Sequence, residues 1–206
     1  MRFISKVIVP LGILASSFVA PSFAEEEKGF YFKGGIGITD VSDVTATVNS
    51  SAVSIEIDSG VSFTAGVGYD FGNDVRTEIG YDKTTGDISK IAGSSSSADV
   101  DASNFSASVF KDFSGGDSKF TPYVGAGIGS TQIDVGTLTI NGTSYTGSDS
   151  NATSYGLTLG TDYELNDSST LFVEGNYKKI GDLTITGVEY TDISPLGVNA
   201  GIKVSF

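Results

Sequence analysis

The sequence predicts an all-β protein: an eight-stranded antiparallel up-and-down transmembrane β-barrel with short periplasmic turns and long extracellular loops. Three observations carry this prediction. Eight segments alternate between apolar and other residues with a period of two, the links between them alternate in length, and a secretory signal precedes them. A strand that contacts lipid must be apolar on that side, and its other side is polar only where it faces a protected lumen, so the pattern indicates a closed barrel.

Residues 1–24 have the features of a signal peptide that is removed from the mature protein. Two basic residues precede an apolar run over 7–19, and Ser22-Phe23-Ala24 supplies small residues at the two positions that a signal peptidase reads. The apolar run contains Pro10 and is shorter than the ~20 residues that a spanning helix needs. We therefore expect a signal peptide over 1–24 and an outer-membrane β-barrel domain over 25–206.

Eight segments show the period-two pattern of strands with two different faces. They span residues 29–39, 59–71, 75–84, 101–113, 119–131, 153–165, 170–179 and 195–206. In the first three, the apolar face consists of Phe30, Phe32, Ile36 and Ile38, then Val61, Phe63, Ala65, Val67, Tyr69 and Phe71, then Val75, Ile79 and Tyr81. The opposite face of each segment carries mainly glycine, small polar and charged residues.

The later segments follow the same rule with some exceptions. The fourth and seventh are less regular, because Phe110 and Phe172 fall on the otherwise polar face. The last segment places Leu196, Val198, Ala200, Ile202, Val204 and Phe206 on one face. Its end resembles the C-terminal signal by which outer-membrane barrels are recognised for insertion, with Phe206, Val204 and Ile202 as the residues concerned.

The links between the segments alternate strictly in length. Short links lie at 72–74, 114–118 and 166–169, and long links lie at 40–58, 84–100, 131–152 and 180–194. Short turns on the periplasmic side and long loops outside are the arrangement of outer-membrane barrels, and a soluble barrel has no reason to keep it.

The long links carry most of the charge. They hold eleven acidic residues and one base, Lys90, which gives −10 of the mature chain's −15. Alternation over 44–48 and 53–57 predicts a hairpin that turns at Asn49-Ser50-Ser51, and Asn141-Gly142 is a strong two-residue turn signal. We expect these loops to project as β extensions beyond the membrane, with an anionic surface.

Aromatic residues fall at both ends of the apolar faces, as the interfacial girdles of a membrane barrel require. The girdle at the short-turn end is predicted to contain Phe30, Tyr69, Phe71, Phe113, Phe120, Tyr163 and Phe206. The second girdle is predicted to contain Phe63, Tyr81, Phe105, Tyr155 and Tyr177.

The polar face carries more charge than the dry core of a soluble barrel tolerates. We predict a charge network in the lumen that includes Lys33, Asp70, Arg76, Glu78, Asp82, Glu174, Lys178 and Lys203. Arg76 is expected to pair with acidic neighbours among Asp70, Glu78 and Glu174. A soluble ligand-binding barrel, which would turn its apolar face inward, is therefore the least favoured interpretation, after the two membrane-barrel functions given below.

The amino-acid composition limits the catalytic and metal-binding chemistry that the protein can perform. The chain has neither histidine nor cysteine, so thiol nucleophiles and the common zinc sites are excluded. Carboxylates such as Glu78 and Asp82 could do acid-base work, but lumen salt bridges with Arg76 and Lys178 are the favoured explanation. The sequence predicts no catalytic, cofactor or metal site, and no nucleic-acid partner, because the mature chain is strongly negative.

Four motifs carry a family resemblance. They are "GYDFGNDVRTEIGYD" at 68–82, "TPYVGAGIG" at 121–129, "LGTDYEL" at 159–165 and "GVNAGIKVSF" at 197–206. The chain resembles the OmpA-type, porin-family outer-membrane β-barrel. The resemblance implies residence in the cell outer membrane, contact with its lipid and lipopolysaccharide, and insertion by the barrel assembly machinery. The peptidoglycan-binding domain of full-length OmpA has no counterpart in these residues, so that anchoring is not carried over.

Two function classes follow. The favoured one is a structural and surface-display protein, in which side chains fill the lumen and the loops meet extracellular ligands. The alternative is a small porin-like channel that conducts small solutes through the charged lumen. That alternative requires gaps at the inward glycines 35, 37, 66, 68, 125, 127 and 129.

Overall fold

The computed structural model describes residues 28–41, 44–48, 51–91, 94–115, 118–140, 143–185 and 188–206. The predicted signal peptide lies outside these residues. So do the turn positions 49, 50, 141 and 142.

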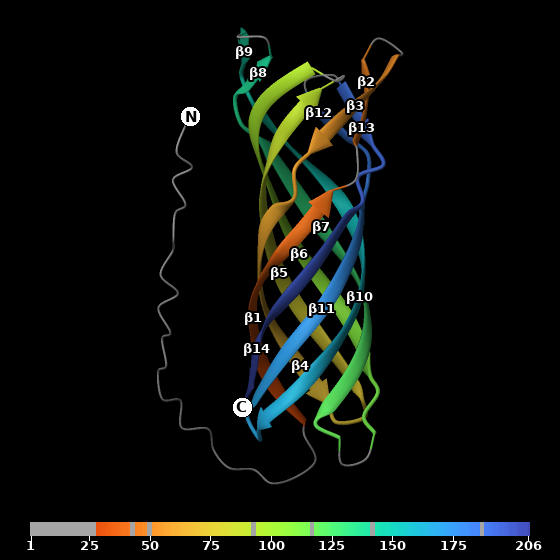
Figure 1. Ribbon diagram of the computed structural model, residues 1–206. Coiled ribbons are helices and arrows are strands. Elements are labelled where there is room, and N and C mark those ends of the chain that lie inside the picture. The colour runs from red at the N-terminus through yellow and green to blue at the C-terminus, as the bar shows by residue number, and fades with distance from the viewer. Residues whose placement is uncertain are drawn as a thin grey trace, which may run out of the picture.

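Within the described residues, eight long strands form one closed antiparallel barrel (Figure 1). They are β1 (Lys28–Val41), β4 (Gly60–Phe71), β5 (Val75–Ile91), β6 (Ser94–Asp112), β7 (Phe120–Val135), β10 (Ser148–Asn166), β11 (Ser169–Ile180) and β14 (Pro195–Ser205). Each pairs with the next in that order, and β14 pairs with β1 to close the ring. The predicted fold class is confirmed.

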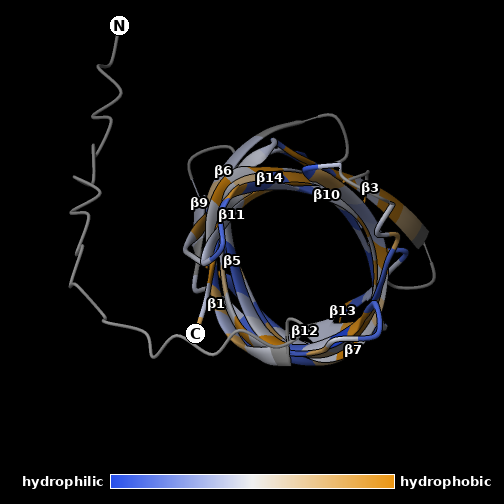
Figure 2. Cartoon of the chain, turned by 90° about the horizontal axis from the view of Figure 1, so that it is seen from below, coloured by the Kyte–Doolittle hydropathy of each residue, from blue (hydrophilic) through white to orange (hydrophobic). Residues whose placement is uncertain are grey.

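The alternation of side chains gives the barrel an apolar exterior and a polar interior at the level of its lower half. Phe32 and Leu159 point outward and are 55% and 67% exposed, whereas Lys33 and Glu174 point inward and are buried. Figure 2, which looks along the barrel axis, shows hydrophobic and hydrophilic residues alternating around the wall. The described residues contain no helix that is long and apolar enough to cross a membrane.

Several strands run well beyond their predicted ends at the upper rim. β5 continues to Ile91 instead of residue 84, and β6 begins at Ser94 instead of residue 101. Six short strands add hairpins there: β2 (Val44–Val48), β3 (Ser51–Ile57), β8 (Leu138–Ile140), β9 (Thr143–Tyr145), β12 (Leu183–Ile185) and β13 (Val188–Thr191). The predicted β extensions are therefore present.

The upper hairpins join one another. β13 pairs with β2, and β3 pairs with β5, so the first and last long links share one sheet (Figure 1). β8 pairs with β6 on another side of the rim. The barrel wall thus continues above its eight-stranded part.

Tight turns close the lower rim. Between β4 and β5, Gly72 and Asp74 adopt positive φ angles of 69° and 59°. Asp70 Oδ1 accepts a hydrogen bond of 2.8 Å from the Gly72 amide, which stabilises this turn. The short links that the sequence predicted lie together at this end.

Aromatic rings meet at the same rim. Phe206 stacks on Phe32 with ring centroids 5.1 Å apart, and its amide donates to the Phe30 carbonyl over 3.0 Å. Phe120 and Tyr163 pack with centroids 4.8 Å apart. Ile202 and Val204 point outward on β14 beside this group. Phe206 therefore forms part of the lower aromatic girdle.

Candidate functional site in the barrel lumen

Charged side chains from six strands meet in the lower half of the lumen. They are Lys33 of β1, Arg76 and Glu78 of β5, Asp112 of β6, Asp162 of β10, Glu174 of β11 and Lys203 of β14. We call this group the lumen network. Each side chain points inward because it occupies the inward parity of its strand.

One half of the lumen network is centred on Lys33. Its Nζ donates to both carboxylate oxygens of Glu174 at 2.8 Å and lies 3.6 Å from Glu78 Oε1. Tyr123 Oη donates to Glu174 Oε2 over 2.8 Å, and Tyr31 Oη donates to Glu78 Oε2 over 3.0 Å. Each carboxylate thus binds the lysine and one tyrosine.

The other half is centred on Arg76, which is only 5% exposed. Arg76 Nη1 lies 3.1 Å from Asp162 Oδ2, and Nη2 lies 3.3 Å from Asp112 Oδ1. Lys203 Nζ also donates to Asp162 Oδ2. Buried charges of this kind are tolerated only when paired, and here every charge has an opposite neighbour.

The predicted partners of Arg76 were wrong. The guanidinium binds Asp112 and Asp162, not Asp70, Glu78 or Glu174. Glu78 and Glu174 both bind Lys33, and Asp70 is used by the lower turn between β4 and β5. The predicted charge network did not include Asp112, because the apolar pattern of β6 is irregular. Asp112 lies two residues after Phe110, so both side chains point to the same, inner face.

Aromatic rings fill the space between the charges. Tyr31 lies opposite Gly68, Phe110 opposite Gly125, and Tyr123 opposite Gly160 on neighbouring strands. A Cβ on Gly68 would lie 2.1 Å from Tyr31 Cζ, and one on Gly125 would lie 2.3 Å from Phe110 Cδ1. Two of the seven glycines that the channel alternative required, Gly68 and Gly125, therefore seat rings and open no gap, whereas Gly127 and Gly129 line a cavity.

The rings also contact the cations directly. Arg76 Cζ lies 4.4 Å from the Tyr123 ring centroid and 4.9 Å from that of Phe110. Lys33 Nζ lies 4.7 Å from the centroid of Phe172, which is only 1% exposed. Cations over aromatic faces are attracted by the ring quadrupole, so the rings stabilise the charges that they surround.

A second polar layer lies closer to the upper rim. Lys178 Nζ lies 2.7 Å from Asp82 Oδ2, and Asn104 Nδ2 donates to the same oxygen over 3.2 Å. Asn104 Oδ1 accepts from Thr131 over 2.9 Å and from Ser154 over 2.7 Å. The predicted residues Asp82 and Lys178 thus pair with each other, apart from the lumen network. Their side chains are 24% exposed.

The lumen network is held together mainly by attraction between opposite charges. The lumen network sets three cations against four carboxylates. Among the described residues, no group of three or more Asp and Glu side chains is placed to hold a metal ion. What this geometry can do chemically is to brace the strands against one another across the lumen.

Comparison with known proteins identifies related barrels. The outer membrane protein beta-barrel domain family matches residues 11–206. Neisserial surface protein A is similar in structure, with a TM-score of 0.62 and 21% identity over 86% of this chain and 97% of that one. Ail of Yersinia pestis and outer membrane protein W of E. coli follow at TM-scores of 0.48 and 0.46, with 13% and 16% identity over 86% and 88% of this chain and 99% and 100% of theirs. No curated protein matches the sequence.

Proposed function

Because the chain belongs to the outer membrane protein beta-barrel domain family and so resides in the outer membrane, we propose that it is a structural, non-enzymatic barrel that displays its acidic loops at the cell surface. The observation that carries this proposal is the filled lumen. Seven charged side chains and four aromatic rings occupy its lower half, with their charges paired. Eight strands leave an interior just wide enough for side chains to fill.

The position of the internal cavities supports the same conclusion. A cavity of about 50 Å³ lies against Lys33, Glu78 and Glu174, and one of about 130 Å³ lies near the upper rim. Neither is lined by Arg76 or Asp112. The Arg76 half of the lumen network therefore lies below both cavities and serves as a plug.

The loops supply the surface that meets partners. Their charge of −10 favours cationic ligands, and divalent cations that bridge the protein to lipopolysaccharide are one such class. The upper hairpins pair with one another, so this surface is carried by one continuous sheet.

Single-channel recording in a planar bilayer tests the plugged lumen. The unboiled protein, shown to be folded by its altered gel mobility before boiling, should give no conductance steps. Reproducible steps would overturn the proposal in favour of the small-solute channel.

Cysteine labelling tests the surface display, because the 206-residue chain contains no cysteine of its own. Ser144→Cys in β9 at the upper rim should react on intact cells with a maleimide that does not cross membranes. Ser168→Cys in the lower turn is the matched control and should react only after the cells are opened. The reverse pattern would contradict the proposed orientation.

A further inference from the structure

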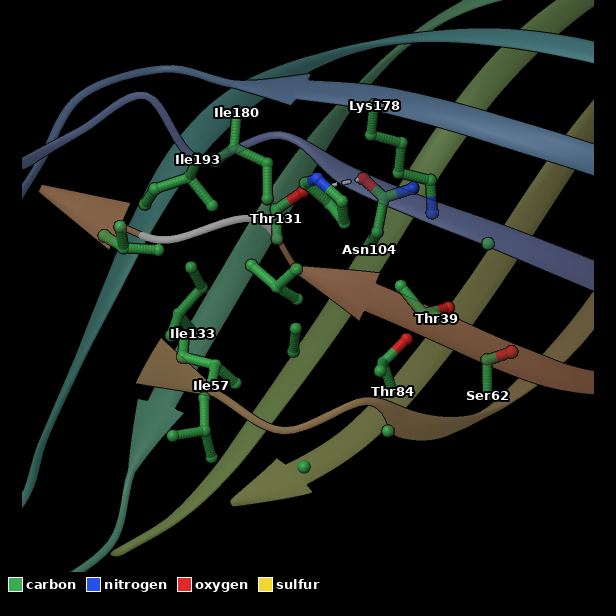
Figure 3. Close-up of a pocket in the computed structure, with 18 of the residues that line it drawn as sticks. Thr39, Ile57, Ser62, Thr84, Asn104, Thr131, Ile133, Lys178, Ile180 and Ile193 are labelled. Carbon is green, nitrogen blue, oxygen red and sulfur yellow. Dashed lines mark hydrogen bonds between the residues drawn. The ribbon is translucent and has the colours of Figure 1, made fainter. Parts of the chain in front are cut away.

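The interior of the barrel changes character toward the upper rim. Above the layer of Asn104 and Lys178, the wall of the larger cavity becomes aliphatic (Figure 3). Its apolar lining includes Ile57, Ile88, Ile133, Ile180, Leu183 and Ile193. We call this space the upper chamber. These side chains come from extensions and hairpins that are far apart in sequence, so the fold itself assembles the chamber.

The chamber is larger than ordinary packing leaves empty. Its walls are well buried: Leu183 is 2% and Ile180 3% exposed. The chamber measures about 130 Å³, several times the roughly 30 Å³ that one water molecule occupies in the liquid. An engineered apolar cavity of about 150 Å³ in another protein stays dry and binds benzene or xenon. The upper chamber is of comparable size and chemistry, and it fits one small ring.

The floor of the chamber offers no free charge to a ligand. Lys178 is paired with Asp82, and Asn104 is bonded to Asp82, Thr131 and Ser154. An anion that entered would lose its hydration without gaining an unpaired counter-charge. Anions are further disfavoured by Asp58, which also lines the chamber, and by the acidic loops around the rim. The chamber therefore selects uncharged molecules over anions.

We propose that the upper chamber binds a small uncharged apolar molecule, of the size of one aromatic ring or a short hydrocarbon chain. This goes beyond the structural role and is independent of it, because the chamber lies above the plug. A barrel with a silent lumen can bind such a molecule, and so can one that conducts.

Methyl NMR of the protein in lipid nanodiscs, with toluene as the probe, tests this binding. The methyl signals of the isoleucines distinguish binding in the chamber from partition into the lipid, because some isoleucines line the chamber and others face the lipid. Those that line the chamber are Ile55, Ile57, Ile88, Ile133, Ile180 and Ile193. Those on the lipid-facing exterior are Ile36, Ile38, Ile79, Ile128 and Ile202.

Toluene in the chamber should shift the chamber methyls in a saturable way and give nuclear Overhauser effects to them. Shifts confined to the exterior methyls, growing without saturation, would show partition into lipid and would overturn the proposal. Benzoate has the same ring with a negative charge and should leave the chamber methyls unchanged. Saturable benzoate binding there would overturn the selection for uncharged molecules.

A matched pair of variants on β6 locates the site. Ala102 lines the chamber, whereas Ala107 lies on the exterior of the same strand. Ala102→Leu fills the chamber and should weaken toluene binding roughly tenfold or more, whereas Ala107→Leu should leave it unchanged. Equal binding by both variants would refute the location. If Ala102→Leu fails to fold, the Overhauser effects of the wild-type protein decide the question.

Discussion

Replacement of Arg76 is the most direct test of the lumen network. Arg76→Met keeps an unbranched apolar stem but removes the charge that binds Asp112 and Asp162. Asp162 retains Lys203, so its carboxylate stays compensated. Asp112 loses the cation that it is paired with and becomes a buried carboxylate next to another one.

The expected cost follows from that imbalance. Removing one partner of a buried ion pair typically costs about 3–5 kcal/mol, because the remaining charge stays desolvated. The contacts of the guanidinium with Tyr123 and Phe110 are lost as well. With a urea dependence of about 2 kcal/mol per molar, a loss of about 4 kcal/mol lowers the unfolding midpoint by about 2 M.

The midpoint is best measured in lipid vesicles from the gel mobility of unboiled samples, since the chain contains no tryptophan to report unfolding. Lys83→Met is the control, because its ion pair with Asp101 is about 40% exposed on both sides and should contribute little. Adding Asp112→Asn to Arg76→Met should recover part of the loss. A midpoint equal to that of Lys83→Met, or no recovery in the double variant, would refute the assignment of Arg76 to a buried network with Asp112.

Three further outcomes are expected. Deletion of Phe206 should lower the amount of protein that the assembly machinery inserts, measured in isolated outer membranes, without changing the urea midpoint of the barrel that is inserted; normal levels would count against its role as a signal. Gly125→Ala should lower the free energy of unfolding by about 1–3 kcal/mol, and with it the urea midpoint, because the added methyl collides with the Phe110 ring; an unchanged midpoint would mean that the ring moves freely. Slight desolvation and the facing Asp99 raise the pKa of the exposed Asp87 at the upper rim, so the stability of this rim should fall as the pH rises from the ordinary range of an aspartate through that raised value. Asp99→Asn should lower the Asp87 pKa in a carboxyl-carbon NMR titration, and an unmoved value would exclude their interaction.

The wall of the barrel could be predicted from the sequence because the membrane imposes a simple rule. Every second residue of a lipid-contacting strand must be apolar, and the strands over 29–39 and 195–206 obey it with few exceptions. Above the membrane the rule no longer holds. Residues 94–100 are mostly serine and still belong to β6, because the cross-strand hydrogen bonds to β5 hold them without an apolar outer face.

The contacts inside the lumen could be predicted only in part. Alternation assigns Lys33 and Glu174 to the inner face, but it does not say that they meet, 141 residues apart in the chain. Their meeting depends on the tilt of the strands and on the register between them, which set the height of each side chain along the axis. The error over Arg76 has this origin, because its partners are fixed by height and not by closeness in sequence.

The upper chamber is apolar because the apolar residues of the strands move from the outer face to the inner face above the membrane. On β5, Ile79 points outward at the membrane level, whereas Ile88 points inward near the upper rim and is only 7% exposed. On β7, Ile128 points outward and Ile133 lines the chamber. The backbone alternation continues through both strands, but the apolar residues change from one parity to the other. Where lipid surrounds the wall, the apolar side faces out; where water surrounds it, the hydrophobic effect turns the same residue types inward. The change of parity therefore marks where each strand leaves the membrane. It also explains why a barrel with a charged lumen has an aliphatic chamber near its upper rim.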